Sequence, residues 1–132
     1  MKFFFDFRAA DGSLGKPNYD SDVHQVVVRP VIKAGQKAAI WHASASSAAL
    51  PNLSVKGGSL DEENYWLILR IGRRDIGRSF GLGTRMGFDI GINGPYPGEG
   101  GRKSQIMMFG TSSNCSDASR FGVGMLEKEA QR

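Results

Sequence analysis

Three glycines within residues 79–94, SFGLGTRMGFDIGING, have a spacing used by some dinucleotide-binding loops, Gly81-x-Gly83-x-x-x-Gly87. Such a loop holds a pyrophosphate only where the glycines follow a strand and open a helix, whose N-terminal N–H groups face the phosphates. Residues 86–93 instead alternate with a period of two, which predicts a strand. One face would hold Met86, Phe88, Ile90 and Ile92, and the other Gly87, Asp89, Gly91 and Asn93. The segment therefore argues against a nucleotide site.

Catalytic and metal-binding patterns are weak in this chain. Cys115 is the single cysteine, which excludes a disulfide framework and a cysteine-based zinc site. The two histidines, His24 and His42, belong to no cluster of acidic residues in the sequence. Glu62 and Glu63 are adjacent and point apart in an extended segment, whereas a glycosidase needs two acids facing one bond. We expect no catalytic residues, no metal and no cofactor, and keep a small esterase or glycosidase as a third hypothesis.

Aromatic rings could do a different chemistry, because the apolar C–H face of a pyranose stacks on a π surface while amides, carboxylates and Arg bond the hydroxyls. The candidate ligand-binding residues are Trp41, Trp66, Asp89, Asn93, Tyr96, Arg102 and Phe109. Trp41 and Trp66 fall within strand patterns, so we favour core packing over ligand binding for both. We also favour core packing for Phe109. Tyr96 stands between two prolines in GPYPG, which predicts an exposed ring.

Asp89 and its neighbours have two interpretations. The small side chains on the Asp89 face would let a loop, another layer or a ligand come close. The structural alternative, which we favour, is that Asp89 accepts hydrogen bonds from loop N–H groups or pairs with Arg85 or Arg102. Arg102 lies in a Gly-rich loop and is expected to be exposed, where its guanidinium could bond sugar hydroxyls or a carboxylate.

The elements that must position these residues are short strands. Alternating or apolar segments occur at residues 2–8, 22–31, 37–43, 52–56, 63–72, 86–93, 103–110 and 120–127. Both faces of the segment 63–72 are largely apolar, which predicts a central strand covered on both sides. Turn signals separate the segments, and no long helical pattern occurs. The pattern predicts an all-β fold, an antiparallel, jelly-roll-like β-sandwich of seven to eight short strands with little helix.

Composition bounds the class of protein. The 132 residues, 40% hydrophobic with a net charge of +4, indicate one domain over residues 1–127 and a charged C-terminal tail at 128–132. The basic residues are dispersed, apart from Arg70, Arg73, Arg74 and Arg78, so we expect neither a nucleic-acid partner nor a membrane partner. Asp6 and Arg8 interrupt the apolar start too early for a signal peptide. We expect a cytoplasmic chain as given, or an extracellular one if it is a fragment of a secreted protein.

Several motifs together resemble the family 9 carbohydrate-binding modules, sandwich domains attached to xylanases and other glycan-acting proteins. The chain has YWLILRIGRRDIG, RMGFDIGING, GEGGRKSQIMMFG and SRFGVGMLE in the order and at about the spacing of the family pattern. KFFFDFR resembles an earlier strand of that pattern. Gly87-Phe88-Asp89-Ile90 is the sharpest motif. The chain resembles the C-terminal two-thirds of such a domain, truncated at its N-terminus.

Three positions depart from the family pattern. Asn93-Gly94 replaces Asn-Asp, Met108-Phe109-Gly110 replaces Trp-x-Gly, and Ile68 and Gly72 replace a Glu and a Pro. The resemblance implies a non-catalytic module that binds a polysaccharide or oligosaccharide. The alternative is a structural or interaction module of the same fold without a sugar site. Because the family's first strands have no counterpart here, we expect a homodimer that buries the edge or face of the N-terminal Phe-rich strand.

Overall fold

The structure, a computed structural model, describes residues 1–8, 12–30, 37–43, 50–61, 64–76, 81–95 and 102–127, with only the backbone of 41–43, 95, 102 and 103. Tyr96 and the tail 128–132 lie outside the described residues. The strands are β1 (Lys2–Asp6), β2 (Val23–Arg29), β3 (Ala39–Ala43), β4 (Ser54–Ser59), β5 (Tyr65–Arg70), β6 (Arg85–Pro95), β7 (Arg102–Met107) and β8 (Gly122–Met125). The fully described short 3-10 helices are η2 (Arg73–Asp75), η3 (Ser112–Cys115) and η4 (Ala118–Arg120).

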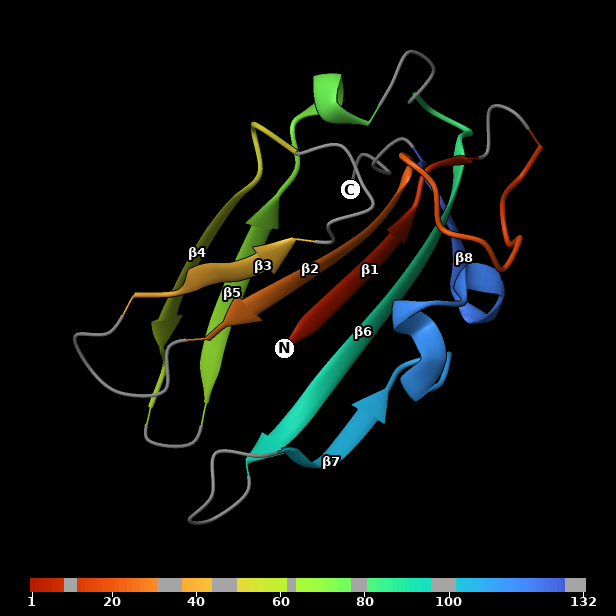
Figure 1. The fold of residues 1–132 in the computed structure, drawn as a ribbon. Helices are drawn as coiled ribbons and strands as arrows, with labels where there is room; N and C mark the ends of the chain where they lie inside the picture. The colour runs from red at the N-terminus through yellow and green to blue at the C-terminus, as the bar shows by residue number, and fades with distance from the viewer. Residues whose placement is uncertain are drawn as a thin grey trace.

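The strands form two antiparallel sheets packed against each other (Figure 1). The larger sheet has six strands in the order β3-β2-β1-β6-β7, with β8 also paired to β6, and the smaller sheet is the β4–β5 hairpin. This confirms the predicted all-β antiparallel sandwich. Short strands dominate because alternating segments are interrupted by turn residues, such as Gly12, Gly15 and Gly83 with positive φ. No helix among the described residues is long and apolar enough to cross a membrane.

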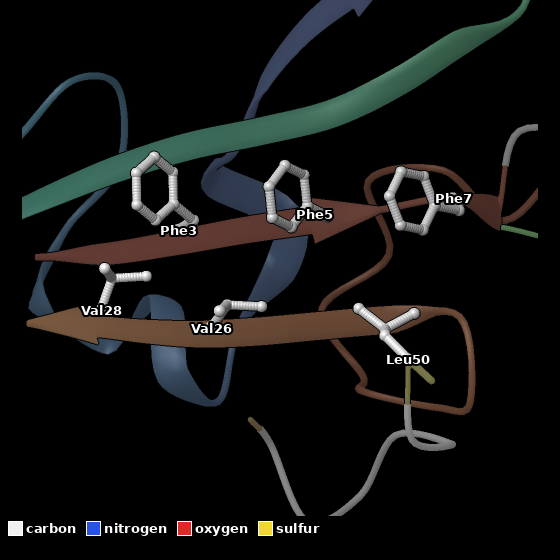
Figure 2. Close-up of a cluster of buried hydrophobic side chains, with 6 residues drawn as sticks. All are labelled: Phe3, Phe5, Phe7, Val26, Val28 and Leu50. Carbon is white, nitrogen blue, oxygen red and sulfur yellow. The ribbon is translucent and has the colours of Figure 1, made fainter. Parts of the chain in front are cut away.

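The strand β1 is the centre of the larger sheet. It pairs with β2 through Phe3–Val26 and with β6 through Phe3–Ile90. The alternation sends Phe3, Phe5 and Phe7 to the inner face, where Figure 2 shows their rings in a row beside Val26, Val28 and Leu50. The expected dimer contact through β1 is therefore wrong, because both edges of β1 are paired and its phenylalanines are buried.

The hairpin β4–β5 covers the inner face of the larger sheet with Val55, Leu67 and Leu69. Its other face is open to solvent, with Trp66 41% and Ile68 48% exposed. The prediction that this strand is central and covered on both sides is wrong, because β5 pairs with β4 alone among the described strands. Apolar composition marked both faces of β5, but no second layer within the described residues covers the outer one.

A second, smaller core lies on the outer face of the larger sheet. Phe4 and Val23 project there and pack against Ala118 and Phe121 from the segment that holds η3 and η4. Tyr19 adds an edge-on contact with Phe121 and donates its hydroxyl to the backbone oxygen of Asn114. Burial raises the pKa of the Tyr19 phenol, so it remains a donor over the whole neutral range. The larger sheet is thus covered in part on both faces.

Arg8 connects this outer face to the loop after β1. Its guanidinium forks onto Asp6 with Nε–Oδ1 and Nη2–Oδ2 distances of 2.8 and 2.7 Å, and it also donates to the backbone oxygens of Lys16 and Asn18. Burial acts to raise the pKa of Asp6, but the hydrogen bonds from Arg8 and from the Gly15 N–H outweigh it and lower that pKa. The pair holds the loop against the sheet, because both side chains are almost fully buried.

Replacing Arg8 with Ala should lower the free energy of unfolding by about 3–5 kcal/mol, because it leaves the Asp6 carboxylate buried without its partner. Urea unfolding followed by circular dichroism measures the change. Arg120→Ala, at an exposed position in η4, is the control and should change the value by no more than about 0.5 kcal/mol. A loss at Arg8 as small as in the control would contradict the structural role of the pair.

His24 should make stability fall in mild acid. Burial beside Phe7 lowers the pKa of His24, against the opposing pull of Asp22, Asp20 and Asp75. The folded state favours the neutral imidazole, so this contribution is complete above about pH 6.5 and is lost as the pH falls toward the lowered folded pKa. Unfolding curves at pH 7.5 and 5.5 should show a larger loss for the native chain than for His24→Gln. Equal losses would rule out His24 as the cause of the acid sensitivity. Asp6 does not contribute to this difference, because its pKa lies below the ordinary value of 3.8.

Candidate functional site

Asp89 organises the loop that follows β7. Its carboxylate is fully buried on the outer face of β6 and accepts hydrogen bonds from the backbone N–H groups of Phe109 and Gly110 at 3.0 and 2.7 Å. The side-chain amide of Asn114 donates to the same carboxylate at 2.6 Å, and the N–H of Ile90 at 2.7 Å. This confirms the favoured structural interpretation of Asp89, in which loop N–H groups occupy it. Its oxygens position the loop and are turned away from solvent.

Asn114 and Gly110 complete the turn. Asn114 is 1% exposed, and its Oδ1 accepts from the Thr111 N–H at 2.9 Å while its Nδ2 donates to Asp89. Gly110 lies so close that a Cβ there would stand 2.2 Å from the Asn114 Oδ1, so only glycine fits without a shift of the loop. The sequence indicates a loop at residues 111–115 but does not single out Asn114, because nothing in TSSNC marks which polar residue turns inward.

The arrangement of this loop leaves Phe109 exposed. Phe109 is 60% exposed. The core packing that the sequence favours for this residue is therefore wrong. The ring lies on the backbone of Gly122 at the start of β8, where an added Cβ would meet ring carbons at 2.5–2.7 Å. A glycine in the adjacent strand therefore provides a flat base for one side of the ring. The other side faces solvent, on a loop held by a buried carboxylate.

Trp66 is a second exposed ring built in the same way. It stands opposite Gly58 in the β4–β5 hairpin, and a Cβ on Gly58 would lie 2.8 Å from the indole Nε1. The hairpin and the loop after β7 lie on opposite sides of the sandwich in Figure 1. Trp66 and Phe109 therefore belong to two separate surfaces rather than one site. The sequence favours core packing for Trp66 as well, and this is wrong because Trp66, like Phe109, is exposed.

The remaining predicted residues divide by location. Asn93 shares the outer face of β6 with Asp89, and its Oδ1 is buried without a hydrogen-bond partner. Trp41 lies in β3 and Arg102 opens β7, but the side chains of both are outside the described part of the structure, as is the whole of Tyr96. The structure thus brings Asp89 and Phe109 together and leaves the roles of Trp41, Tyr96 and Arg102 as predictions.

A Gly-x-Ser-x-Gly spacing, Gly77-Arg78-Ser79-Phe80-Gly81, also occurs in the chain. A nucleophile elbow with this spacing turns from a strand into a helix. Here η2 precedes the segment, and the next described element after Gly81 is the strand β6. Residues 77–80 are not described. Within the described residues, no group of three or more His, Cys, Asp or Glu side chains could hold a metal ion.

Comparison with known proteins identifies the fold. No protein-family model matches this chain, and no curated protein does. A carbohydrate binding module family 9 from Caldicellulosiruptor kristjanssonii, solved with cellotriose, superposes with a TM-score of 0.70 at 20% identity. The chain has the fold of a family 9 carbohydrate-binding module. The glucose complex of that organism's module matches with a TM-score of 0.69, also at 20% identity.

The extent of the match is unequal for the two proteins. The superpositions cover 98% and 99% of this chain but only 57% and 60% of the solved modules. The chain therefore spans less than two thirds of the length of those modules. The resemblance carried by Gly87-Phe88-Asp89-Ile90 is confirmed at the level of fold.

Replacing Asp89 with Ala should lower the free energy of unfolding by about 3 kcal/mol, because the loop N–H groups and the Asn114 amide lose a charged acceptor. Asp89→Asn should lose less, since one oxygen still accepts. Hydrogen exchange at Phe109 and Gly110 should accelerate in Asp89→Ala, because their N–H groups become free. Glu127→Ala, at an exposed position, is the matched control. Unchanged exchange in Asp89→Ala would contradict the anchoring role.

Proposed function

We propose that this chain is a non-catalytic carbohydrate-binding module that stacks a sugar ring on Phe109. The observation that carries the proposal is the exposed Phe109 ring, backed by Gly122 on a loop that Asp89 anchors. A flat ring with a fixed base loses little conformational freedom on binding, which favours affinity. The fold is shared with modules solved with cellotriose and with glucose, and this supports a glucose-based oligosaccharide as the ligand.

Polar groups around the ring would orient the sugar hydroxyls. Asn93 is one candidate, because it lies on the Asp89 face of β6, four residues further along the strand, and its buried Oδ1 has no hydrogen-bond partner in the structure. The backbone of Arg102 lies at the start of β7, opposite Pro95 and at the other end of the strand from Phe109. Arg102 and Tyr96 therefore remain candidates on the sequence evidence alone. Asp89 is excluded from direct contact, because its oxygens are buried and occupied. Its role is to hold Phe109 in place.

A second candidate function is an interaction module of the same fold that forms a homodimer. The supporting observation is a pair of exposed isoleucines, Ile92 and Ile106, which lie opposite each other on β6 and β7. They are 46% and 69% exposed on the sheet face whose other half the β4–β5 hairpin covers. Gel filtration with light scattering tests this alternative. A dimer without any response to sugars would favour it over sugar binding.

Phe109→Ala should weaken binding of cellotriose at least about tenfold, which corresponds to about 1.4 kcal/mol of lost stacking. Isothermal titration calorimetry measures the affinity. Phe109→Trp should retain binding, because the indole offers a larger flat surface. Gly122→Val should also weaken binding, since its side chain would displace the ring.

Trp66→Ala is the matched control for this experiment and should leave the cellotriose affinity unchanged. The β4–β5 hairpin, which carries Trp66, lies on the other side of the sandwich from the loop after β7 (Figure 1). Circular dichroism should show that each variant keeps the β-sheet spectrum. Binding that is unchanged in Phe109→Ala but lost in Trp66→Ala would refute the assignment of the site. Binding absent from the native chain would refute the function for these ligands.

A further inference from the structure

The outer face of the β4–β5 hairpin carries a combination of groups that the proposed sugar site does not use. Alternation turns Ser54, Lys56 and Gly58 outward from β4, and Trp66, Ile68 and Arg70 outward from β5. All but Gly58 are exposed. The inward residues of the same strands belong to the main core, so the outward set cannot turn in without breaking it. We call these six outward residues the hairpin face.

The apolar part of this face is a flat strip along β5. The Trp66 indole rests on Gly58, and Ile68 follows two residues later on the same side. Successive outward residues are about 6.6 Å apart along a strand. Trp66 and Ile68 therefore form a continuous apolar surface. Trp66 is 41% exposed and Ile68 is 48% exposed. An exposed tryptophan fixed on a glycine is suited to stacking on an apolar ring face.

Positive charge flanks this strip. Lys56 stands directly opposite Ile68, and Arg70 stands opposite Ser54, which makes the two cations diagonal neighbours about 7–8 Å apart. Trp66 is the diagonal neighbour of Lys56 on its other side. A ligand stacked on Trp66 would thus meet one cation within a side-chain length and a second further along the strand.

Among the described residues, no carboxylate forms an ion pair with Lys56 or Arg70. Asp61, at the hairpin turn, accepts from the Asn64 backbone and amide, and Asp75, after β5, accepts from the Asn52 backbone and amide. In the part of the chain that the structure describes, all ion pairs involve Arg8. Two further exposed cations, Arg73 and Arg74, follow in η2. The hairpin face therefore has unpaired positive charge beside an exposed ring.

We propose that the hairpin face binds an acidic polysaccharide, with a pyranose ring stacked on Trp66 and uronate carboxylates held by Lys56 and Arg70. The inference rests on the proposed function in taking a carbohydrate as the ligand, but it uses a surface separate from Phe109. Charge complementarity selects the acidic class, because neutral sugars would leave both cations without partners. Guanidinium and ammonium groups are the usual partners of carboxylates.

A single-stranded nucleic acid is the competing anionic ligand. Surfaces that bind such strands generally stack successive bases on several aromatic side chains along a basic groove. The hairpin face instead places the aliphatic Ile68 beside its one ring. An aliphatic neighbour fits the C–H face of a second sugar better than a second base, so the polysaccharide is favoured, and nucleic acid becomes an outcome of the test.

The test uses polygalacturonate oligosaccharides titrated into the full chain, followed by calorimetry and tryptophan fluorescence. The native chain should bind with a shift in tryptophan emission, and the affinity should fall as salt is added. Trp66→Ala and the double variant Lys56→Gln/Arg70→Gln should each bind at least about tenfold more weakly, equivalent to one decade in Kd. Lys16→Gln/Arg120→Gln removes the same charge from exposed positions elsewhere, so it should bind like the native chain.

The outcomes separate this inference from the proposed function. Phe109→Ala should lose cellotriose but keep polygalacturonate, and Trp66→Ala should do the reverse. If the native chain fails to bind polygalacturonate, or if the two charge variants lose it equally, the hairpin face is not the site. Tighter binding of single-stranded DNA, lost in Trp66→Ala, would overturn the ligand class. The outcomes that would overturn the inference require no cellotriose binding, so the inference can stand where the proposed function fails.

Discussion

The central strand β1 is buried on both faces, and the rest of the structure depends on that constraint. Phe3, Phe5 and Phe7 must face the hairpin, so Phe4 and Asp6 must face the opposite side. Because side chains alternate strictly along a strand, a shift of one residue would turn Lys2 and Asp6 toward the hairpin and move Phe3, Phe5 and Phe7 out of the main core. The partner strands are therefore held in one register. That register places Asp89 of β6 directly opposite Phe4 on the outer face.

The register of β1 and β6 thus fixes the position of Asp89, and Asp89 in turn fixes the loop that carries Phe109. An anionic carboxylate on a buried sheet face needs several donors, and the segment from Phe109 to Asn114 supplies them. The loop that satisfies the charge is thereby held against β6, and Phe109 is turned outward on Gly122. Packing and binding are coupled here, because the residue that stabilises the outer face also fixes the ring proposed to bind sugar.

The two exposed rings, Phe109 and Trp66, are supported in the same way but have different surroundings. Each lies on a glycine of a neighbouring strand, Phe109 on Gly122 and Trp66 on Gly58, so that a missing side chain makes room for a flat ring. The surroundings decide the ligand we assign to each. Phe109 stands on a loop held by Asp89, with no cation among its described contacts, whereas Trp66 is flanked by Lys56 and Arg70. A neutral sugar suits the first and an acidic sugar the second.

The sequence by itself determined the fold class and most strands, because the period of two at Phe3–Phe7 and at Met86–Ile92 is a local property of the chain. It also pointed correctly to Asp89 as a structural acceptor. Only the tertiary structure decided whether Trp66 and Phe109 are exposed, because aromatic residues of the same types also fill protein cores. Whether such a ring is covered depends on which residues of other strands pack against it, and each of these rings packs against a glycine, Trp66 against Gly58 and Phe109 against Gly122. The pairing of β1 on both edges was equally a tertiary result, since β6 lies about eighty residues away in a chain whose local pattern cannot specify its partners.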